Sequence, residues 1–148
     1  MGSHLTKKDY KFFEMARKVA ENSTYKQFHI GAIIVYKGNV VSTGYNSRKT
    51  HPIQKKYNRK YRYFNDSDKP IEDMLHAEIS SLVNIPYCVD QNIDYSQAKI
   101  YIYRICPGKR LKMGLCRPCP ACFAALRDKG FKKVYYTTDD GFCMEELY

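Results

Sequence analysis

The feature that most constrains this chain is a pair of cysteines, Cys119 and Cys122, at metal-ligand spacing in Pro-Cys-Pro-Ala-Cys. Well upstream, His76 and Glu78 stand two positions apart in His-Ala-Glu. Two thiolates and one imidazole provide three protein ligands, and a catalytic zinc keeps its fourth position for water, whose pKa it lowers to about 7. Glu78 would then be left to move protons. We therefore expect a fold that brings His76 and both cysteines together around one Zn²⁺ ion.

The same cysteines allow two other interpretations. With Cys116 added they form CxxCxxC, which can begin an iron–sulfur run. Such a run would continue at position 126, which is Leu126, so the fourth ligand would be a distant one, Cys106 or Cys143. A purely structural zinc site with Cys116 as its fourth ligand is the second alternative. Neither alternative gives Glu78 a role.

The combined pattern His-x-Glu…Pro-Cys-x-x-Cys is the signature of zinc-dependent nucleobase deaminases. Over roughly residues 29–138 the chain resembles the cytidine/deoxycytidylate deaminase superfamily. The resemblance implies zinc ligation by His76, Cys119 and Cys122, proton transfer by Glu78, and hydrolytic deamination with cytosine to uracil as the expected reaction. It also implies that the backbone N–H of Ala77 contacts the base carbonyl.

Asn46 follows Gly-Tyr directly after a predicted hairpin. In the deoxycytidylate branch of the superfamily, a Gly-Tyr-Asn segment at this point places the asparagine against the substrate sugar, so the resemblance makes Asn46 a substrate-binding candidate. The alternative is an Asx-turn that ends the strand.

Hydrophobic periodicity and turn residues predict the elements. They are a helix at 7–21 begun by a capping box at Thr6 and Asp9, a hairpin of strands 29–36 and 40–43, a helix at 70–84, a strand at 98–105, a helix at 120–129 and a strand at 131–138. Residues 139–148 are left as a tail, with a helix as one option. This order is α/β, and the resemblance implies a three-layer α/β/α sandwich with a central mixed β-sheet and helices on both faces.

Two positions in this prediction conflict with simple helical geometry. His76 and Glu78 both fall inside the helix expected at 70–84, yet side chains two apart on a helix point to nearly opposite faces. Helical spacing alone therefore does not bring both residues to one metal.

Residues 47–69 show no clear period and are expected to form a long basic loop insertion. Tyrosines lie between its cations, and cations next to aromatic rings are how single-stranded nucleic acid is held. The candidate phosphate contacts are Arg48, Lys49, Lys55, Lys56, Arg59 and Lys60. The alternative is a solvated insertion that includes part of a helix. A second basic loop is expected at 106–117.

A net charge of +10 predicts anionic partners but does not choose among them. A histidine as first ligand separates the chain from free-cytidine deaminases, which usually use cysteine, so a cytosine mononucleotide such as deoxycytidylate is the favoured substrate. Cytosine in single-stranded DNA or RNA comes second and adenosine in tRNA third. The non-enzymatic alternative is a zinc-stabilised nucleic-acid-binding module.

Length predicts a single domain over residues 1–148, of which 1–4 resemble a cloning remnant. The chain has no apolar run long enough to span a membrane and no recognisable signal peptide. Six cysteines in that context favour a reducing compartment, so we expect a cytoplasmic protein. Oligomerisation has no signature in the sequence.

Overall fold

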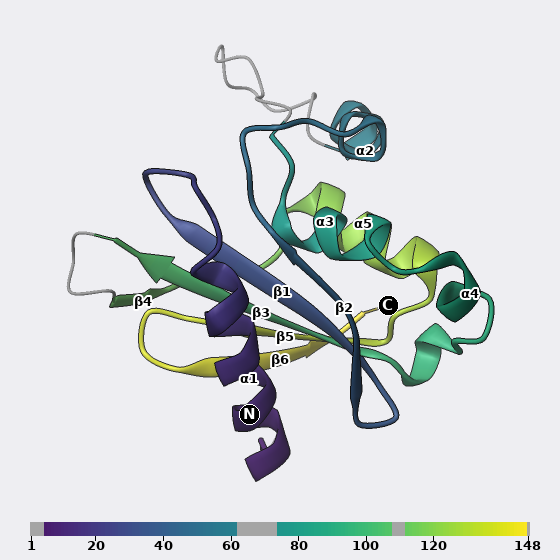
Figure 1. Cartoon of the computed structure of the whole chain (residues 1–148), viewed down its shortest axis with the longest axis horizontal. Coiled ribbons are helices and arrows are strands. Elements are labelled where there is room, and N and C mark those ends of the chain that lie inside the picture. Colours follow the sequence, from purple (N-terminus) through teal and green to yellow (C-terminus); the bar gives the residue numbers. More distant parts are fainter. Residues whose placement is uncertain (1–4, 62–73, 108–111, 148) are drawn as a thin grey trace.

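The computed structural model describes residues 5–61, 74–107 and 112–147. In these ranges six strands form one mixed sheet in the order β2-β1-β3-β5-β6, with β4 paired to β3 (Figure 1). Their bounds are β1 His29–Tyr36, β2 Asn39–Tyr45, β3 Lys99–Cys106, β4 Lys112–Gly114, β5 Lys133–Thr137 and β6 Phe142–Glu146. Only the β3–β5 pairing is parallel among these strands.

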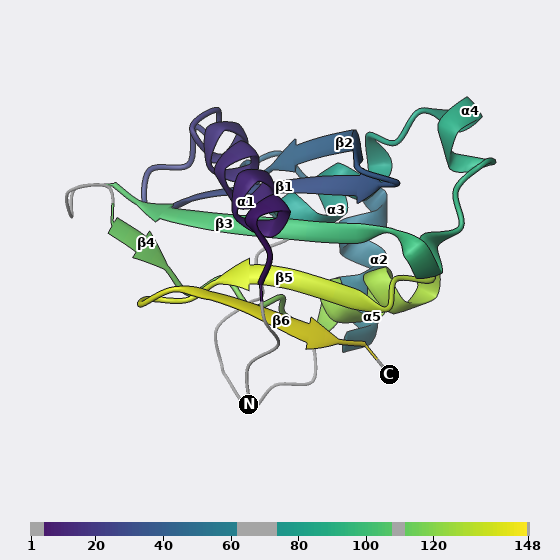
Figure 2. The same cartoon turned by 90° about the horizontal axis from the view of Figure 1, so that it is seen from below.

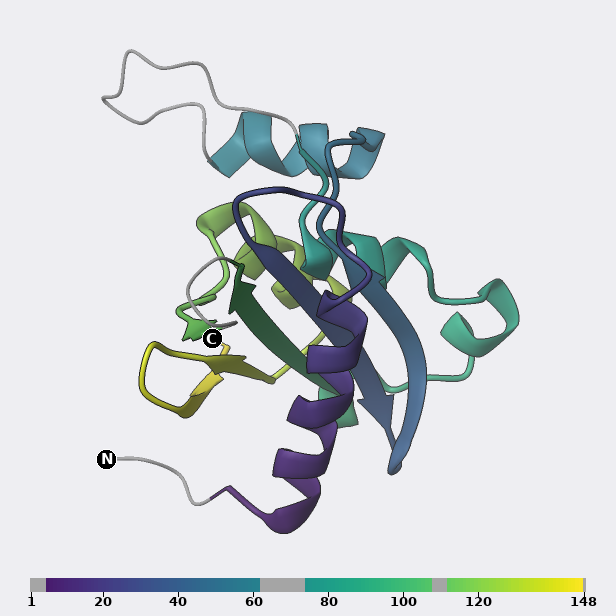
Figure 3. The same cartoon turned by 60° about the vertical axis from the view of Figure 1, so that its left-hand side comes forward.

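Helices cover both faces of this sheet, which confirms the expected three-layer α/β/α arrangement. Helix α1 (Lys7–Ala20) lies on one face, and α3 (Ala77–Val83) and α5 (Pro120–Lys129) lie on the other (Figure 2). Helix α2 (Pro52–Tyr61) packs against α5, at the end of the molecule remote from α1 (Figure 3). The short α4 (Tyr87–Asp90) and a 3₁₀ turn (Tyr95–Gln97) lead from α3 to β3.

Alternation along the strands divides the core between the two faces. On β1, Ile33 and Val35 pack with Phe12 and Phe13 of α1. Ile34, which lies between them in the strand, points to the other face and belongs to the core under α3 and α5. That second core joins side chains from the strands to Ala77 of α3 and Leu126 of α5. Each face of the sheet is therefore closed by its own helices.

Helix α1 begins with the predicted capping box. The Thr6 hydroxyl accepts from the Asp9 N–H at 3.2 Å, and the Thr6 N–H donates to the Asp9 carboxylate at 2.8 Å. Asp9 also accepts from the Tyr101 hydroxyl of β3 at 2.6 Å, so the cap is tied to the sheet beneath it.

Two glycines allow helices to lie directly on the sheet. A Cβ on Gly31 of β1 would lie 2.3 Å from the backbone nitrogen of Ala20 in α1, and one on Gly44 of β2 would lie 2.3 Å from that of Ser81 in α3. No larger residue fits at either position without displacing the helix above it.

Several sequence expectations were wrong. The segment at 47–69 is not a loop throughout, because residues 52–61 form α2. The helix expected at 70–84 begins only at Ala77; residues 70–73 lie outside the described ranges, as do 62–69. The tail forms β6, paired with β5 after a turn in which Thr138 N–H donates to the Gly141 carbonyl at 2.7 Å. The second basic loop contains β4.

No helix in the described part of the chain has the length and apolar character needed to cross a membrane.

Candidate metal centre

His76 is the N-cap residue of α3 and has an extended backbone, with φ −81° and ψ 154°. An N-cap residue lies outside the helical repeat. The opposite-face geometry expected for residues two apart on a helix therefore does not apply to His76 and Glu78. Both side chains line the same cavity, which removes the conflict noted in the sequence.

The cysteine pair occupies the equivalent position on α5. Cys119 is the N-cap, Pro120 takes the first helical position, where proline fits best, and Cys122 follows on the first turn. Although Cys119 precedes the helix, its Sγ lies within 4.8 Å of both the Cys122 Sγ and the donor atom of His76. Two helix N-termini thus bring the histidine and both thiols together.

The donor atoms fit one zinc ion. The Nδ1 atom of His76 lies 3.3 Å from Sγ of Cys122 and 3.7 Å from Sγ of Cys119, and all three donors lie within 4.8 Å of one another. A tetrahedral zinc with usual bond lengths separates a sulfur and a nitrogen ligand by about 3.6 Å. The observed distances bracket this value, so the set could hold Zn²⁺ with one position left for water.

A hydrogen bond between the two thiols and the neighbouring His76 favour ionisation of one thiol, that of Cys119. A hydrogen bond from Cys122, opposed by burial and supported by His76, lowers the pKa of Cys119 to about 4. Glu78 is only 5% exposed, and its burial raises the pKa of its carboxyl, with His76 acting in the opposite direction. The site therefore holds a buried carboxyl group next to a thiolate and an imidazole.

Cys116 does not join this group. Its buried Sγ lies 3.1 Å from the Thr137 hydroxyl and 3.4 Å from the Ile102 carbonyl, and burial raises its pKa to about 12. Among the described residues, His76, Cys119 and Cys122 form the one such cluster, and neither Cys106 nor Cys143 belongs to it. The iron–sulfur and four-ligand zinc interpretations thus lack their fourth ligand here.

A cavity of about 170 Å³ opens onto the centre. The residues that line it include four of the metal centre and its helix start, namely His76, Ala77, Glu78 and Cys119. Phe28, Asn46 and two cations, Arg104 and Arg117, line it as well. A small molecule in this cavity would contact the metal centre and a cation at once.

Asn46 anchors the start of β1. Its Oδ1 accepts from the Ile30 N–H at 2.8 Å, and its Nδ2 donates to the Phe28 carbonyl at 3.2 Å. These bonds join two strands and do not form an Asx-turn. An amide oxygen has a second lone pair and an amide nitrogen a second hydrogen, so Asn46 can still bond to a ligand in the cavity that it lines.

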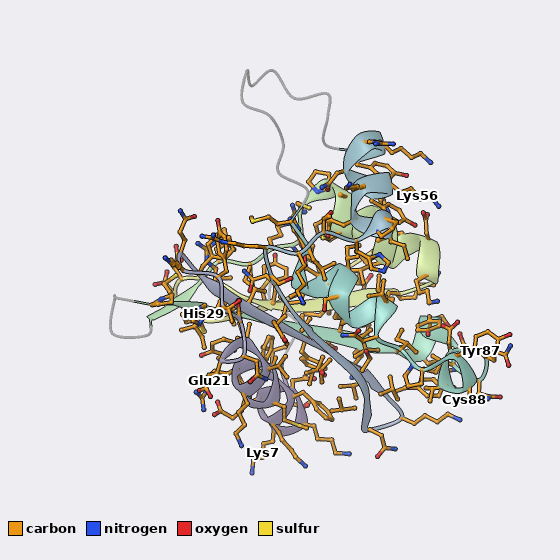
Figure 4. All side chains as sticks on the ribbon, turned by 45° about the horizontal axis from the view of Figure 1, so that its top comes forward. Lys7, Glu21, His29, Lys56, Tyr87 and Cys88 are labelled. Atoms are coloured by element: carbon orange, nitrogen blue, oxygen red, sulfur yellow. The ribbon has the colours of Figure 1, made fainter. Side chains whose placement is uncertain are left out.

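None of the six candidate phosphate contacts, Arg48, Lys49, Lys55, Lys56, Arg59 and Lys60, lines the cavity. Four of them are exposed on α2, the helix on which Figure 4 labels Lys56. Arg48 lies over the Tyr25 ring, 6.0 Å from its centre. The cavity cations, Arg104 and Arg117, were not identified as site residues from the sequence. The available signal for Arg104 was a charge inside an otherwise apolar strand.

A model of the cytidine and deoxycytidylate deaminase zinc-binding region matches residues 6–138. Solved structures with a similar fold include the dCMP deaminase of cyanophage S-TIM5 in apo form, with 22% identity over 87% of this chain and 81% of that one and a TM-score of 0.53. The same enzyme in complex with dCMP and dUMP gives 19% identity over 91% and 85%, with a TM-score of 0.53.

A cytidine deaminase from Burkholderia pseudomallei gives 16% identity over 97% of this chain and 94% of that one, with a TM-score of 0.57. At these identities the likeness concerns the fold. A search among curated proteins found no match. The family model and the donor cluster together identify Zn²⁺ as the cofactor.

Proposed function

Because the chain belongs to the cytidine and deoxycytidylate deaminase family, we propose that it catalyses zinc-dependent hydrolysis of cytosine to uracil in a cytidine or deoxycytidine monophosphate. The observation that carries the proposal is that Glu78 lines the same cavity as His76 and Cys119, whose donor atoms lie together with that of Cys122. A site that only binds zinc has no need for this carboxyl.

When bound, zinc supplies a water molecule that ionises near neutral pH. Glu78 is not needed as a ligand, so its carboxylate can take one proton from this water and pass it to N3 of the cytosine ring. It would then take the second proton from the hydroxyl group added at C4 and deliver it to the departing amine. Water adds at C4, the C4–N bond breaks, and ammonia leaves. General acid–base assistance of this kind contributes about 10²–10⁴-fold to a rate.

Two further groups are proposed to orient the substrate. The Ala77 N–H is the first of the α3 amides, which have no partner within the helix, and it would donate to the base carbonyl. The remaining hydrogen-bonding capacity of Asn46 would serve the sugar. Both residues line the cavity.

Arg104 supports a substrate that carries a phosphate. Its guanidinium group lies 4.5 Å from the centre of the Phe28 ring, and its Nη1 donates to the Leu115 carbonyl at 3.1 Å. Its buried Nε has no hydrogen-bond partner among the described residues. Arg117 is paired with Glu145 at 2.9 Å. Arg104 is therefore the cavity cation with more capacity left for an anion.

A second candidate substrate is cytosine in single-stranded DNA or RNA. The observation that favours it is the row of exposed cations on α2: Lys55, Lys56, Arg59 and Lys60. They lie outside the cavity wall, so they would hold flanking nucleotides and not the reacting one.

The proposal is tested by incubating the zinc-loaded protein separately with deoxycytidylate, deoxycytidine and a cytosine-containing single-stranded oligonucleotide, and by measuring uracil formation chromatographically. We expect deoxycytidylate to react fastest. Glu78→Gln should lower that rate at least about 10²-fold, because the amide cannot carry the proton, while zinc content and melting temperature stay unchanged. A protein inactive on all three substrates, or an active Glu78→Gln variant, would refute the proposal.

A further inference from the structure

The segment that follows β2 holds the backbone directly before the metal centre. Ser47 N–H donates to the Leu75 carbonyl at 3.1 Å, and Leu75 N–H donates to the Lys49 carbonyl at 2.9 Å. The next amide along, that of His76, donates to Oε1 of Gln54 in α2 at 3.0 Å. Residues 47–54 therefore bind three consecutive backbone groups: the N–H and the carbonyl of Leu75, and the N–H of His76, the candidate zinc ligand.

Gln54 is itself held in place by a second buried amide. Its Nε2 donates to Oδ1 of Asn58, one helical turn further along α2, at 3.0 Å. Both side chains are fully buried. Buried amides are costly unless they are hydrogen-bonded. The Asn58 contact therefore fixes which end of the Gln54 amide faces His76, with the oxygen toward the backbone N–H.

Helix α3 has no side chain of its own that accepts a hydrogen bond from the His76 N–H. In a capping box, the side chain at the third helical position accepts from the N-cap N–H. That position in α3 is Ile79, which has no acceptor. The N-cap side chain of His76 makes no capping bond either, since its Nδ1 faces the cysteine sulfurs. Gln54 thus supplies, from a different helix, the acceptor that α3 does not provide.

Helix α2 is also fixed to the cysteine-bearing helix. The Tyr57 hydroxyl, on the same face of α2 as Gln54, donates to the Asp128 carboxylate of α5 at 2.7 Å. Helix α2 therefore contacts the candidate histidine ligand through Gln54, and through Tyr57 it contacts the C-terminal end of α5, away from the cysteines.

We propose that Gln54, oriented by Asn58, is a positioning residue that fixes His76 relative to Cys119 and Cys122 and so slows the loss of zinc. The inference rests on the proposed role of His76 as a zinc ligand. Helix α2, whose composition predicts only a basic surface, would thus also support the metal centre.

The test measures zinc release from the loaded protein to an excess of a chromogenic chelator. Gln54→Met keeps the side-chain volume but removes the acceptor, and changes of this type around metal ligands typically cost about 10–100-fold in metal affinity. We expect zinc release to accelerate by about tenfold or more. Gln54→Glu keeps an oxygen for the His76 N–H, and a protonated carboxyl group can still donate to Oδ1 of Asn58, so release should stay close to the original rate.

Tyr57→Phe is the matched control, because it removes a hydrogen bond of α2 without touching His76. It should lower the melting temperature and leave the rate of zinc release unchanged. If Gln54→Met yields no folded protein, Gln54→Asn replaces it, since the shorter side chain withdraws the oxygen from His76.

The inference would be overturned if Gln54→Met, or Gln54→Asn in its place, released zinc at the original rate. It would also be overturned if Tyr57→Phe accelerated release equally. Because the readout is metal release, a protein that holds zinc as expected but deaminates nothing would refute the proposed function and leave this inference intact.

Discussion

Arg104 is the residue through which the substrate proposal can be tested most directly. It lines the cavity beside the metal centre, and its Nε is buried without a partner among the described residues. Because Nε is buried, a phosphate in the cavity would meet the outer N–H groups of the guanidinium, of which Nη1 donates to Leu115. Such charge-assisted hydrogen bonds are among the stronger polar contacts.

Arg104→Gln should therefore raise KM for deoxycytidylate while leaving KM for deoxycytidine unchanged. A charge-assisted hydrogen bond contributes about 1.5–3 kcal/mol, which corresponds to roughly 10–100-fold in KM. Steady-state kinetics on the two substrates checks this. Arg117→Gln is the comparison, because its guanidinium is already paired with Glu145. An equal rise of KM for both substrates would show that Arg104 acts on the shape of the cavity and not on a phosphate.

Asp9 carries a second residue-level prediction, on the side of the sheet remote from the metal. Burial opposes its ionisation, but hydrogen bonds from Tyr101 and Thr6 outweigh burial and lower its pKa. A carboxyl group with a lowered folded pKa contributes stability that is present above its unfolded pKa, about 3.9, and is lost as pH falls through the folded value.

Asp9→Asn should accordingly lower the free energy of unfolding by about 1–2 kcal/mol at neutral pH, and the difference from the unmodified protein should shrink below about pH 4. Denaturant titrations at a series of pH values measure it. Glu14→Gln, an exposed acid on the same helix paired with Arg17, should have little effect, as is usual for surface ion pairs. A pH-independent difference at Asp9 would contradict the assignment.

Residue types predicted the chemistry of the centre better than its geometry. Histidine, glutamate and two cysteines at their spacings were sufficient to name the donor set that the structure brings together. Spacing could not show that His76 precedes its helix, because an N-cap is defined by backbone angles and not by residue identity. The role of Asn46 at the start of β1 was equally hidden, since its partners are backbone groups.

At the scale of elements, α2 was anticipated only as part of a helix in the alternative interpretation of residues 47–69, because its inner face is polar. Gln54, Tyr57, Asn58 and Tyr61 recur at helical spacing. Periodicity searches look for aliphatic residues at such positions, and two amides and two tyrosines between lysines do not produce that signal. Strands β1, β2, β3 and β5 and helix α5, by contrast, bury aliphatic side chains, and their bounds were predicted to within a few residues. Strands β4 and β6 were not predicted as strands. Burial of aliphatic side chains thus made the central elements predictable, whereas the buried hydrogen bonds that hold α2 left no such signal.

The two close helix–sheet contacts give an element-level prediction. Gly31→Ala and Gly44→Ala should each lower the free energy of unfolding by about 1–3 kcal/mol, because the added methyl group must displace α1 or α3. Only Gly44→Ala should also speed zinc release, because α3 begins next to His76 and α1 lies on the opposite face of the sheet. Urea titration and transfer of zinc to a chelator separate the two effects. Faster release from Gly31→Ala as well would mean that the centre responds to general destabilisation.

At the scale of the whole molecule, the net charge of +10 is not concentrated at the cavity. On α2 the cations Lys55, Lys56, Arg59 and Lys60 face solvent, while the amides face inward. The charge on this helix can therefore be removed without changing the contacts to His76.

Replacing these four cations by glutamine should leave deoxycytidylate turnover unchanged and weaken binding to single-stranded oligonucleotides. Each lost phosphate contact reduces the slope of log affinity against log salt by about 0.7, so up to roughly 3 units should vanish. Replacing Lys7, Lys8, Lys11 and Lys18, which are exposed on α1, removes the same charge elsewhere and should change the slope less. Loss of oligonucleotide deamination with intact deoxycytidylate turnover would favour the polynucleotide as substrate.

The central place of β3 also sets an order of events during synthesis. Strand β3 pairs with β1, β4 and β5, so β1 keeps one open edge from the time it leaves the ribosome until residues 99–105 follow it. An unpaired edge strand invites pairing with other chains. Zinc cannot shorten this interval, because Cys119 and Cys122 are translated after β3. The nascent chain therefore exposes this edge of β1 before it can bind the ion, so zinc cannot protect the edge at that stage.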